Sequence, residues 1–431
     1  MRPHQLITSL AAVLTLASPG QEPASPVAEI DFLTTEIGQQ AKALLTTKGI
    51  DWKSVRVEFL AAAAQVQTDA DQYTLVRRLM ARLQDGHAGI LRSTVKGPDE
   101  SKGRRYTGPR VHLILIGEKV LIRSAFKDAA EAGLRAGQEV LRIDGQPALE
   151  WLNTKATEMQ RQGSGFSTKQ QALYSACHWG LADWEGTPIV FEVKDESGAE
   201  KSVKRIRNGG PNFAPYGPLF PPKDLGFVGR QSFGKTASEF GYIHLRDIPD
   251  SLPIQLDQML EKIGQVPGLI LDMRANGGGG CDHAAVFSRF LAKGQQWGYY
   301  EGKSDHPFTG PIVVIVDAGV RSAGETVAGM FKEDGRAYMI GDSPTAGMSS
   351  QKSEITTPGG RFTVRFYVHS NMGRFNKGRG IEGIGVLPHE IVPVKEEDLL
   401  QDHDTLIIRA EELLKSGFPE DIVDYTGPAA K

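Results

Sequence analysis

The sequence has only two cysteines, Cys177 and Cys281, among its 431 residues. Two cysteines cannot build the disulfide framework of a small secreted scaffold. We predict that they are unpaired, because they fall in stretches that we assign below to different domains. An excess of one charge is also lacking, since the formal net charge is only -3. Such a balance gives no indication of nucleic acid or an anionic membrane surface as a partner.

Metal-binding patterns are missing as well. The sequence contains no H-E-x-x-H and no cluster of Cys and His, so neither a catalytic metal nor another cofactor is predicted. Three histidines, His244, His283 and His369, fall within predicted elements. We interpret them as packing or surface residues.

Long apolar runs are confined to the beginning of the chain. Arg2 precedes an apolar stretch at 6–17, which is too short to span a bilayer, and small and Pro-rich residues follow. We interpret residues 1–25 as a signal peptide; the alternative is a disordered start to a cytosolic chain. The prediction is an exported protein, secreted or periplasmic, without a membrane span.

The length suggests two to four domains. Residues 26–104 are predicted to be a helical region, because apolar residues recur at helical spacing over 32–45, 59–66 and 73–83. The third run ends in L-Q-D-G-H at 83–87. Gly86 is predicted to cap that helix and to leave His87 on the following loop.

Residues 105–207 predict a second unit of two hairpins, 111–115 with 119–123 and 188–193 with 199–206, and a helix near 151–158. Its run A-x-x-A-G-L-x-x-G at 129–137, followed by a strand ending in I-D-G, resembles a PDZ domain of the bacterial protease type. Such domains bind extended peptide C-termini by strand addition. The resemblance implies Gly108, Arg110 and Val111 as peptide-binding residues, although Pro109 beside them lacks an N–H. A small structural β domain is the alternative.

A Gly/Pro-rich linker is predicted at 208–236, and it ends in a misleading motif. Residues 229–236 match the P-loop pattern G-x-x-x-x-G-K-T. A P-loop must open a helix, because the phosphates bind at that helix's N-terminus. A strand at 241–245 follows after only a few residues, so nucleotide binding is not predicted.

Residues 237–400 predict an α/β core with crossover connections, since strands at 241–245, 268–272 and 312–316 alternate with helices at 254–263 and 283–291. Residues 401–431 are predicted to be a C-terminal helix and tail. Ser322 lies in a short turn between the third strand and a helix. A hydrolase places its nucleophile at such a junction, where backbone N–H groups can stabilise an oxyanion. A capping box formed by Ser322 and Glu325 is the alternative.

Five stretches occur in a recognisable order. They are L-x-D-G-H at 83–87, the PDZ-like segment, L-I-L-D-x-R-x-N-G-G-G at 269–279, S-A-G-E at 322–325 and I-E-G-I-G-V-x-P at 381–388. Together they resemble the C-terminal processing and tricorn-like serine proteases of peptidase family S41, over nearly the whole mature chain. The resemblance implies a multidomain α/β protein with a ClpP/crotonase-like core. It also implies a tail-specific serine endopeptidase that cleaves peptides or unfolded protein tails through an acyl-enzyme.

Two catalytic designs occur in this family. One uses a lysine base in a G-x-P-T-x-G-K segment, but here that position holds Met348, whose thioether cannot accept a proton at neutral pH. The nearest lysine, Lys352, would lie about 13 Å further along an extended chain. The other design uses a histidine and a glutamate, and the matching residues are His87 and Glu382.

The resemblance therefore implies Ser322 as nucleophile, His87 as base and Glu382 as the acid that orients the histidine. The N–H groups of Ala323 and of Gly277 or Gly278 would form the oxyanion hole. Two other functions stay open: a non-catalytic ligand-binding protein on the same scaffold, and an esterase or lactamase. An oligomer is possible.

Overall fold

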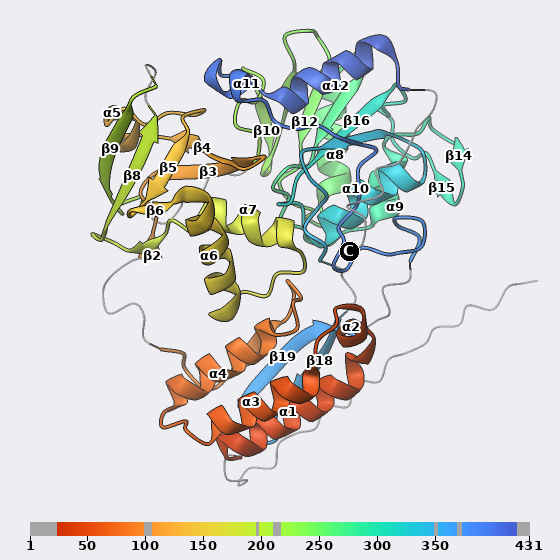
Figure 1. The fold of residues 1–431 in the computed structure, drawn as a ribbon. Helices are drawn as coiled ribbons and strands as arrows, with labels where there is room; N and C mark the ends of the chain where they lie inside the picture. The colour runs from red at the N-terminus through yellow and green to blue at the C-terminus, as the bar shows by residue number, and fades with distance from the viewer. Residues whose placement is uncertain are drawn as a thin grey trace, which may run out of the picture.

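The computed structural model describes residues 24–98, 106–194, 198–209, 217–348, 352–368 and 373–419. Figure 1 shows three units in these ranges: a helical unit, a β-rich unit and a larger α/β core. No helix in the described part of the chain is long and apolar enough to cross a bilayer. The predicted signal peptide lies outside these ranges except for its last two residues.

The N-terminal unit contains the predicted helices: α1 (Pro26–Gln40), α2 (Lys42–Thr47), α3 (Trp52–Ala63) and α4 (Asp69–Ala81). Thr68 and Asp71 form a capping box that starts α4. The prediction that Gly86 caps this helix is wrong. The helix ends at Ala81, and Gln84 adopts the left-handed conformation, with a φ of 49°.

A small antiparallel sheet packs against these helices, in the order β1-β19-β18. Its strands are β1 (Gly89–Ser93), β18 (Lys352–Thr356) and β19 (Phe362–Tyr367). Figure 1 shows the two late strands lying among the N-terminal helices. The position of residues 352–367 therefore differs from the predicted domain boundaries, which placed these residues in the α/β core. The reason is that Phe362, Val364 and Phe366 alternate along β19 and are fully buried in the cluster that the helices form.

The β-rich unit contains both predicted hairpins and one helix that was not predicted. Its elements are β2 (Tyr106–Thr107), β3 (Val111–Ile116), β4 (Lys119–Ala125), α5 (Asp128–Glu131), β5 (Val140–Ile143), β6 (Gln146–Pro147), α6 (Ala148–Arg161), α7 (Lys169–Trp179), β7 (Asp183–Trp184), β8 (Pro188–Lys194) and β9 (Glu200–Ile206). The sheets have the orders β6-β5-β8-β9, β3-β4 and β2-β7. The helix missing from the prediction is α7, which the chain inserts between α6 and β8.

The core is built on a sheet with the order β10-β11-β12-β13-β16-β17-β20. The strands are β10 (Gly226–Val228), β11 (Gln231–Lys235), β12 (Gly241–His244), β13 (Leu269–Asp272), β16 (Ile312–Val316), β17 (Tyr338–Gly341) and β20 (Glu390–Ile391). From β12 onwards neighbouring strands are parallel, whereas β10 and β11 form an antiparallel hairpin. The P-loop-like sequence lies in that hairpin and opens no helix, so the structure agrees with its rejection.

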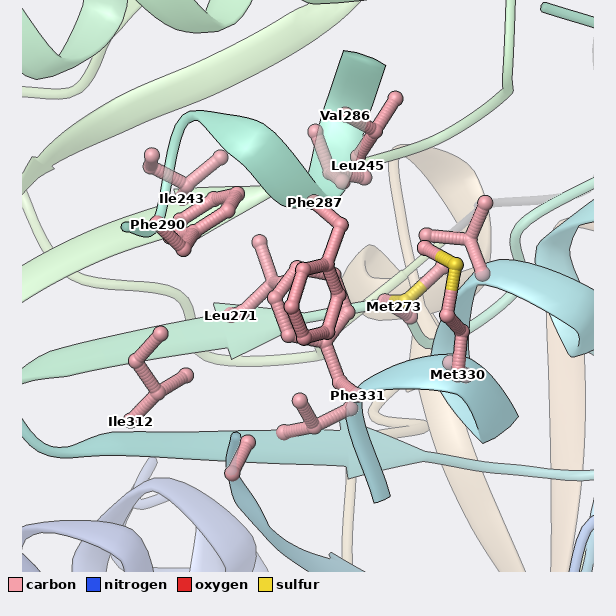
Figure 2. Packing of buried hydrophobic residues seen from close by; sticks show 14 of the residues in the cluster. Ile243, Leu245, Leu271, Met273, Val286, Phe287, Phe290, Ile312, Met330 and Phe331 are labelled. Carbon is pink, nitrogen blue, oxygen red and sulfur yellow. The ribbon is translucent and has the colours of Figure 1, made fainter. Parts of the chain in front are cut away.

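Helices cover both faces of this sheet. The helices are α8 (Leu252–Ile263), α9 (His283–Ser288), α10 (Ala323–Glu333), α11 (Glu396–Leu400) and α12 (Thr405–Ser416), and a short hairpin is formed by β14 (Gln296–Trp297) and β15 (Tyr300–Glu301). One face packs on α8, α9 and α10, where Phe287 and Phe331 lie against Leu271 (Figure 2). The other face packs on α12. Burial on both faces is why the parallel strands are continuous apolar runs.

The two cysteines lie in different units and are both free, as predicted. Cys177 is buried in α7, and Cys281 follows the tetraglycine of the core.

We predict that Phe362→Ala lowers the free energy of unfolding by about 3 to 5 kcal/mol, because it leaves a cavity in a fully buried cluster. Urea unfolding followed by circular dichroism would measure this loss. Val57→Ala is the matched control, since Val57 of α3 is 69% exposed and should change stability by about 0.5 kcal/mol or less. Equal effects of the two variants would contradict the packing of β19 on the helices.

Candidate active site

Ser322 lies between β16 and α10 in an unusual backbone conformation. Its φ is 55° and its ψ is -125°, a region that non-glycine residues rarely occupy. The turn before it is held by Asp317, whose Oδ1 accepts hydrogen bonds from the amides of Ala275 and Gly319, each at 2.9 Å. Ala323 then begins the helix. The serine therefore occupies a sharp strand–turn–helix junction, as the sequence predicted.

The carboxylate of Glu325 connects this junction to a distant segment. It is fully buried and accepts four hydrogen bonds, from Ser322 N at 3.0 Å, Thr345 Oγ1 at 2.5 Å, Gly347 N at 2.7 Å and Met348 N at 2.8 Å. Burial raises the pKa of Glu325 to about 8, although the hydrogen bonds favour the ionised form. Glu325 thus fixes segment 345–348 against Ser322. This role agrees with a structural anchor rather than a second catalytic acid.

Met348 extends the same connection to the loop that carries His87. Its side chain is 7% exposed, and its Sδ accepts a hydrogen bond of 2.8 Å from Gln171 Nε2. A Cβ on Gly86 would lie 2.6 Å from Cγ and Sδ of Met348. The thioether therefore fills the space between the nucleophile segment and the residue before His87.

Lys352, the alternative base, begins β18 in the sheet of the helical unit, where its backbone partner is Tyr367. Burial and the nearby Arg365 lower the pKa of Lys352, and the charge of Asp85 opposes this shift. Its position in that sheet, beyond Met348, gives no support to a Ser/Lys dyad.

The His87 loop is held by a buried carboxylate that sequence reasoning did not single out. Asp85 is fully buried, and it accepts hydrogen bonds from His87 N and Tyr367 N, each at 2.8 Å. On the other side of the loop, Gly86 N donates to Ser167 Oγ at 2.9 Å. The loop is therefore attached both to β19 and to the segment before α7.

Glu382 forms a buried ion pair with Lys48. The distance from Lys48 Nζ to Glu382 Oε1 is 2.7 Å, and the two side chains are 7% and 1% exposed. The same ammonium group donates to the carbonyl of Gln84. Lys48 thus joins the Glu382 segment to the His87 loop, which follows Gln84 by three residues. No sequence signal indicated this pair, because Lys48 and Glu382 are far apart in the chain.

Helix α7 and the residues before it contact these segments from the β-rich unit. Gln170 Nε2 donates to the carbonyls of Thr345 and Ile384, at 3.2 and 3.0 Å. Thr168 Oγ1 donates to the Ala346 carbonyl at 2.8 Å. These contacts attach α7 to the segment held by Glu325 and to the segment that carries Glu382.

The same helix reaches the nucleophile turn. The Arg321 guanidinium lies over the Trp179 ring, 5.5 Å from its centroid. A Cβ on Gly319 would lie 2.5 Å from the hydroxyl oxygen of Tyr174, so only glycine fits at this contact. The β-rich unit is therefore part of the wall of the site.

The predicted oxyanion donors differ in their present hydrogen bonding. Among the described residues the amide of Ala323, the first of α10, has no acceptor. Gly278 lies close to the nucleophile, since a Cβ there would be 2.9 Å from Ser322 Cβ. The amides of Gly277 and Gly278, however, donate to the Arg246 carbonyl at 3.0 Å and to the Asn276 side chain at 2.9 Å.

The fourth glycine, Gly280, donates its amide to the Ile248 carbonyl at 2.7 Å. Within the described chain, this leaves Gly279 as the member of the tetraglycine whose amide has no acceptor. The Ile248 amide in turn donates to the Gly278 carbonyl at 2.9 Å. The peptide between Gly278 and Gly279 is therefore oriented by Ile248.

The residues predicted for peptide docking are engaged within the β-rich unit. The Gly108 carbonyl accepts from Gly209 N at 2.9 Å, and Arg110 donates to Asp128 at 3.2 Å. Val111 begins β3 and is 1% exposed. At Leu115 the outer edge of β3 is already occupied, because its backbone N–H contacts the Cys177 thiol of α7.

Two of the three other histidines considered in the sequence lie in the described elements. His244 Nε2 contacts the Arg274 carbonyl at 3.0 Å, and burial lowers its pKa. His283 begins α9, and His369 lies outside the described residues. No group of three or more His, Cys, Asp or Glu side chains that could hold a metal ion occurs in the described ranges.

Comparisons with known proteins show what the chain as a whole is similar to. Residues 239–392 match the model of peptidase family S41. Over 364 residues the chain is 22% identical to a carboxyl-terminal-processing protease of Picosynechococcus, covering 80% of this chain and 78% of that protein. Over 329 residues it is 23% identical to a carboxy-terminal-processing protease of Bartonella bacilliformis, covering 73% and 67%. The solved structure of mature CPAF is similar in fold, with a TM-score of 0.66 at 13% identity, covering 93% of this chain and 99% of that one.

We predict that Gly86→Ala disrupts the site, because its new Cβ would collide with Met348. Labelling of the serine hydroxyl by a fluorophosphonate should fall at least tenfold. Gly89→Ala, at the start of β1 just after this loop, is the control, since a Cβ there meets nothing within 4 Å. The double variant Gly86→Ala/Met348→Ala should recover labelling. Full labelling of Gly86→Ala itself would contradict the proposed coupling between the loop and Met348.

A second prediction concerns pH. The pKa of Glu325 is about 8 in the folded protein against an ordinary value of 4.5, so the folded state retains a proton that the unfolded chain releases. Its stabilising contribution is present below about pH 4.5 and is lost as the pH rises through about 8. Between pH 4.5 and about pH 8, the free energy of unfolding measured with urea should therefore fall more for the wild type than for Glu325→Gln. Parallel pH profiles of the two proteins would contradict the raised pKa.

Proposed function

We propose that this serine-type peptidase, whose residues 239–392 match the model of peptidase family S41, cleaves peptide bonds near protein C-termini with Ser322, His87 and Glu382. The observation that carries this assignment of residues is a continuous set of contacts. Ser322 N and Met348 N donate to the same carboxylate oxygen of Glu325, and Met348 packs on Gly86, the residue before His87. These contacts support the His/Glu design.

In the proposed mechanism, His87 removes the proton of the Ser322 hydroxyl as the oxygen attacks the peptide carbonyl. The resulting imidazolium then returns the proton to the leaving amine, which leaves an acyl-enzyme. Water hydrolyses this ester with His87 again as base. Glu382 orients the histidine and stabilises its charged form. The Lys48 pair supports this role, because it holds Glu382 beside the His87 loop.

The oxyanion is stabilised by the amide of Ala323, at the N-terminus of α10. We assign the second donor to the tetraglycine. The Gly279 amide has no acceptor within the described chain, whereas the Gly277 and Gly278 amides would have to exchange their present partners. Rotation of a peptide is readily accommodated in a run of glycines.

The substrate class follows from the relatives that are named for carboxyl-terminal processing. We propose that exported proteins with flexible tails are the substrates, and that the β-rich unit is a PDZ-like domain. Segments 1–25, 105–207 and 237–400 would then be the signal peptide, the PDZ-like domain and most of the catalytic core. We also propose that the protein does not bind nucleic acid and that it forms an oligomer.

One observation favours a second candidate, a non-catalytic ligand-binding protein. The amides of Gly277 and Gly278 already have acceptors, so neither is available to an oxyanion in the present arrangement. In this arrangement an oxyanion would rely on the amides of Ala323 and Gly279, and a site in which these two do not converge would bind without cleaving.

Fluorophosphonate labelling of the purified protein decides between the two. We expect the wild type to be labelled, Ser322→Ala to be unlabelled, and His87→Ala to be labelled about 10² to 10⁴ times more slowly. Lys352→Met should label like the wild type. Loss of labelling in Lys352→Met, with labelling kept in His87→Ala, would instead identify a lysine base.

The ion pair gives a further prediction. Lys48→Met leaves the Glu382 carboxylate buried without its cation, which should cost about 3 to 5 kcal/mol of stability or raise the carboxyl pKa. In Lys48→Met the Glu382 carboxyl should stay protonated to a higher pH. The rise of kcat/KM with pH should therefore begin at a higher pH than in the wild type. Lys42→Met, on the exposed surface of α2, is the control. An unchanged pH profile would argue against a role for Glu382 in orienting the base.

A further inference from the structure

The residue before the proposed nucleophile is an arginine whose charge has no partner in the described chain. Arg321 is half-buried, and its Nε donates one long hydrogen bond, 3.4 Å, to the Gly319 carbonyl. Neither Nη atom has an acceptor among the described residues, and no described carboxylate lies within ion-pair distance of the guanidinium. Neither of these nitrogens is buried. Both therefore remain accessible to a ligand.

The guanidinium is held in place by the end of α7. It lies over the Trp179 ring, 5.5 Å from its centroid. Trp179 in turn packs against His178 and Tyr174, whose ring centroids lie 5.7 and 6.3 Å from its own. An arginine stacked in this way loses less conformational freedom on binding a ligand than a side chain that projects into solvent.

The backbone of Arg321 is part of the site itself. Its amide donates to the Asn276 carbonyl at 2.9 Å, and its carbonyl accepts from Gly324 N of α10 at 2.9 Å. A Cβ on Gly278 would lie 2.8 Å from that carbonyl oxygen. The Cα atoms of Arg321 and Ser322 are about 3.8 Å apart, and each residue of an extended substrate adds about 3.3 Å. The guanidinium is therefore within reach of substrate side chains within about three residues of the bond to be cleaved.

The acidic groups around Ser322 are committed to other partners. Glu325 accepts four hydrogen bonds, and Glu382 is paired with Lys48. Asp317 accepts two backbone hydrogen bonds, and burial raises its pKa. Helix α7, which carries Trp179, contains no Asp or Glu. A carboxylate supplied by the substrate is therefore the partner that the arginine lacks.

We propose that Arg321 binds an Asp or Glu side chain of the substrate close to the scissile bond, and so directs the peptidase to acidic segments. A guanidinium presents a planar fork of N–H donors that fits a carboxylate, and charge-assisted hydrogen bonds are roughly twice as strong as neutral ones. The site would thereby distinguish Asp from Asn and Glu from Gln, which have nearly the same shape. This inference rests on the proposed peptidase function and adds a substrate class to it.

The test measures binding by isothermal titration to the full chain carrying Ser322→Ala, so that peptides bind without being cleaved. One ten-residue peptide alternates Asp and Ala, and its control alternates Asn and Ala. Both are acetylated and amidated, so they differ only in side-chain charge, and alternation places a carboxylate near Arg321 in any register. The Asp peptide should bind at least tenfold more tightly. The difference should shrink between about 50 and about 500 mM salt, because accessible charges are screened.

Arg321→Met should abolish this preference. Arg142→Met is the matched control and should keep it, because the Arg142 side chain is 51% exposed on β5 and paired with Glu192. Arg321→Glu should reverse the selectivity, so that a peptide alternating Lys and Ala binds more tightly than the Asp peptide. Such a reversal cannot result from misfolding.

The proposal is overturned if the Asp and Asn peptides bind the Ser322→Ala chain equally, or if Arg321→Met keeps the preference. Fluorophosphonate labelling of the wild type reports separately on the proposed function. Labelling without a preference for the acidic peptide refutes only the role of Arg321. A preference that Arg321→Met abolishes, in a protein that is not labelled, supports the role of Arg321 and refutes only the peptidase function.

Discussion

The arrangement of this site depends on one buried carboxylate. Glu325 accepts four hydrogen bonds and thereby holds the amide of Ser322 and the segment 345–348 in fixed relative positions. A carboxylate without these donors would be too costly to bury, and the donors without the carboxylate would be left unsatisfied. The strained backbone of Ser322, the proposed nucleophile, is maintained by the same interaction, since the Ser322 amide is one of its donors.

Three separate units meet around this anchor. The helical unit supplies the His87 loop and Lys48, the core supplies Ser322 and Glu382, and the β-rich unit supplies α7. None of these units by itself contains all three residues of the proposed site. Contacts between units, such as Met348 on Gly86 and Gln170 on the Glu382 segment, therefore decide whether the functional side chains approach one another. Relative movement of the units would change activity without altering a catalytic residue.

Helix α7 covers part of the β-rich unit and faces the core. On β3, the backbone N–H of Leu115 contacts the Cys177 thiol of this helix. Between the same two elements and the core lies a cavity that Arg123 of β4 lines. The β-rich unit thus places a buried guanidinium at its interface with the core.

The sequence by itself determined many of the elements and suggested the chemistry that we propose. Local patterns were enough for the helices at 26–81, for three parallel strands of the core and for the turn at Ser322, because periodicity and glycine placement act over short distances. Met348 at the lysine position is also a feature of the sequence alone, and it favours the His/Glu design. Only the tertiary structure decided the placement of β18 and β19, the Lys48–Glu382 pair and the anchoring role of Asp85. These features depend on contacts between distant residues, and hydrogen bonds or ion pairs of that kind leave no periodic signal in the chain.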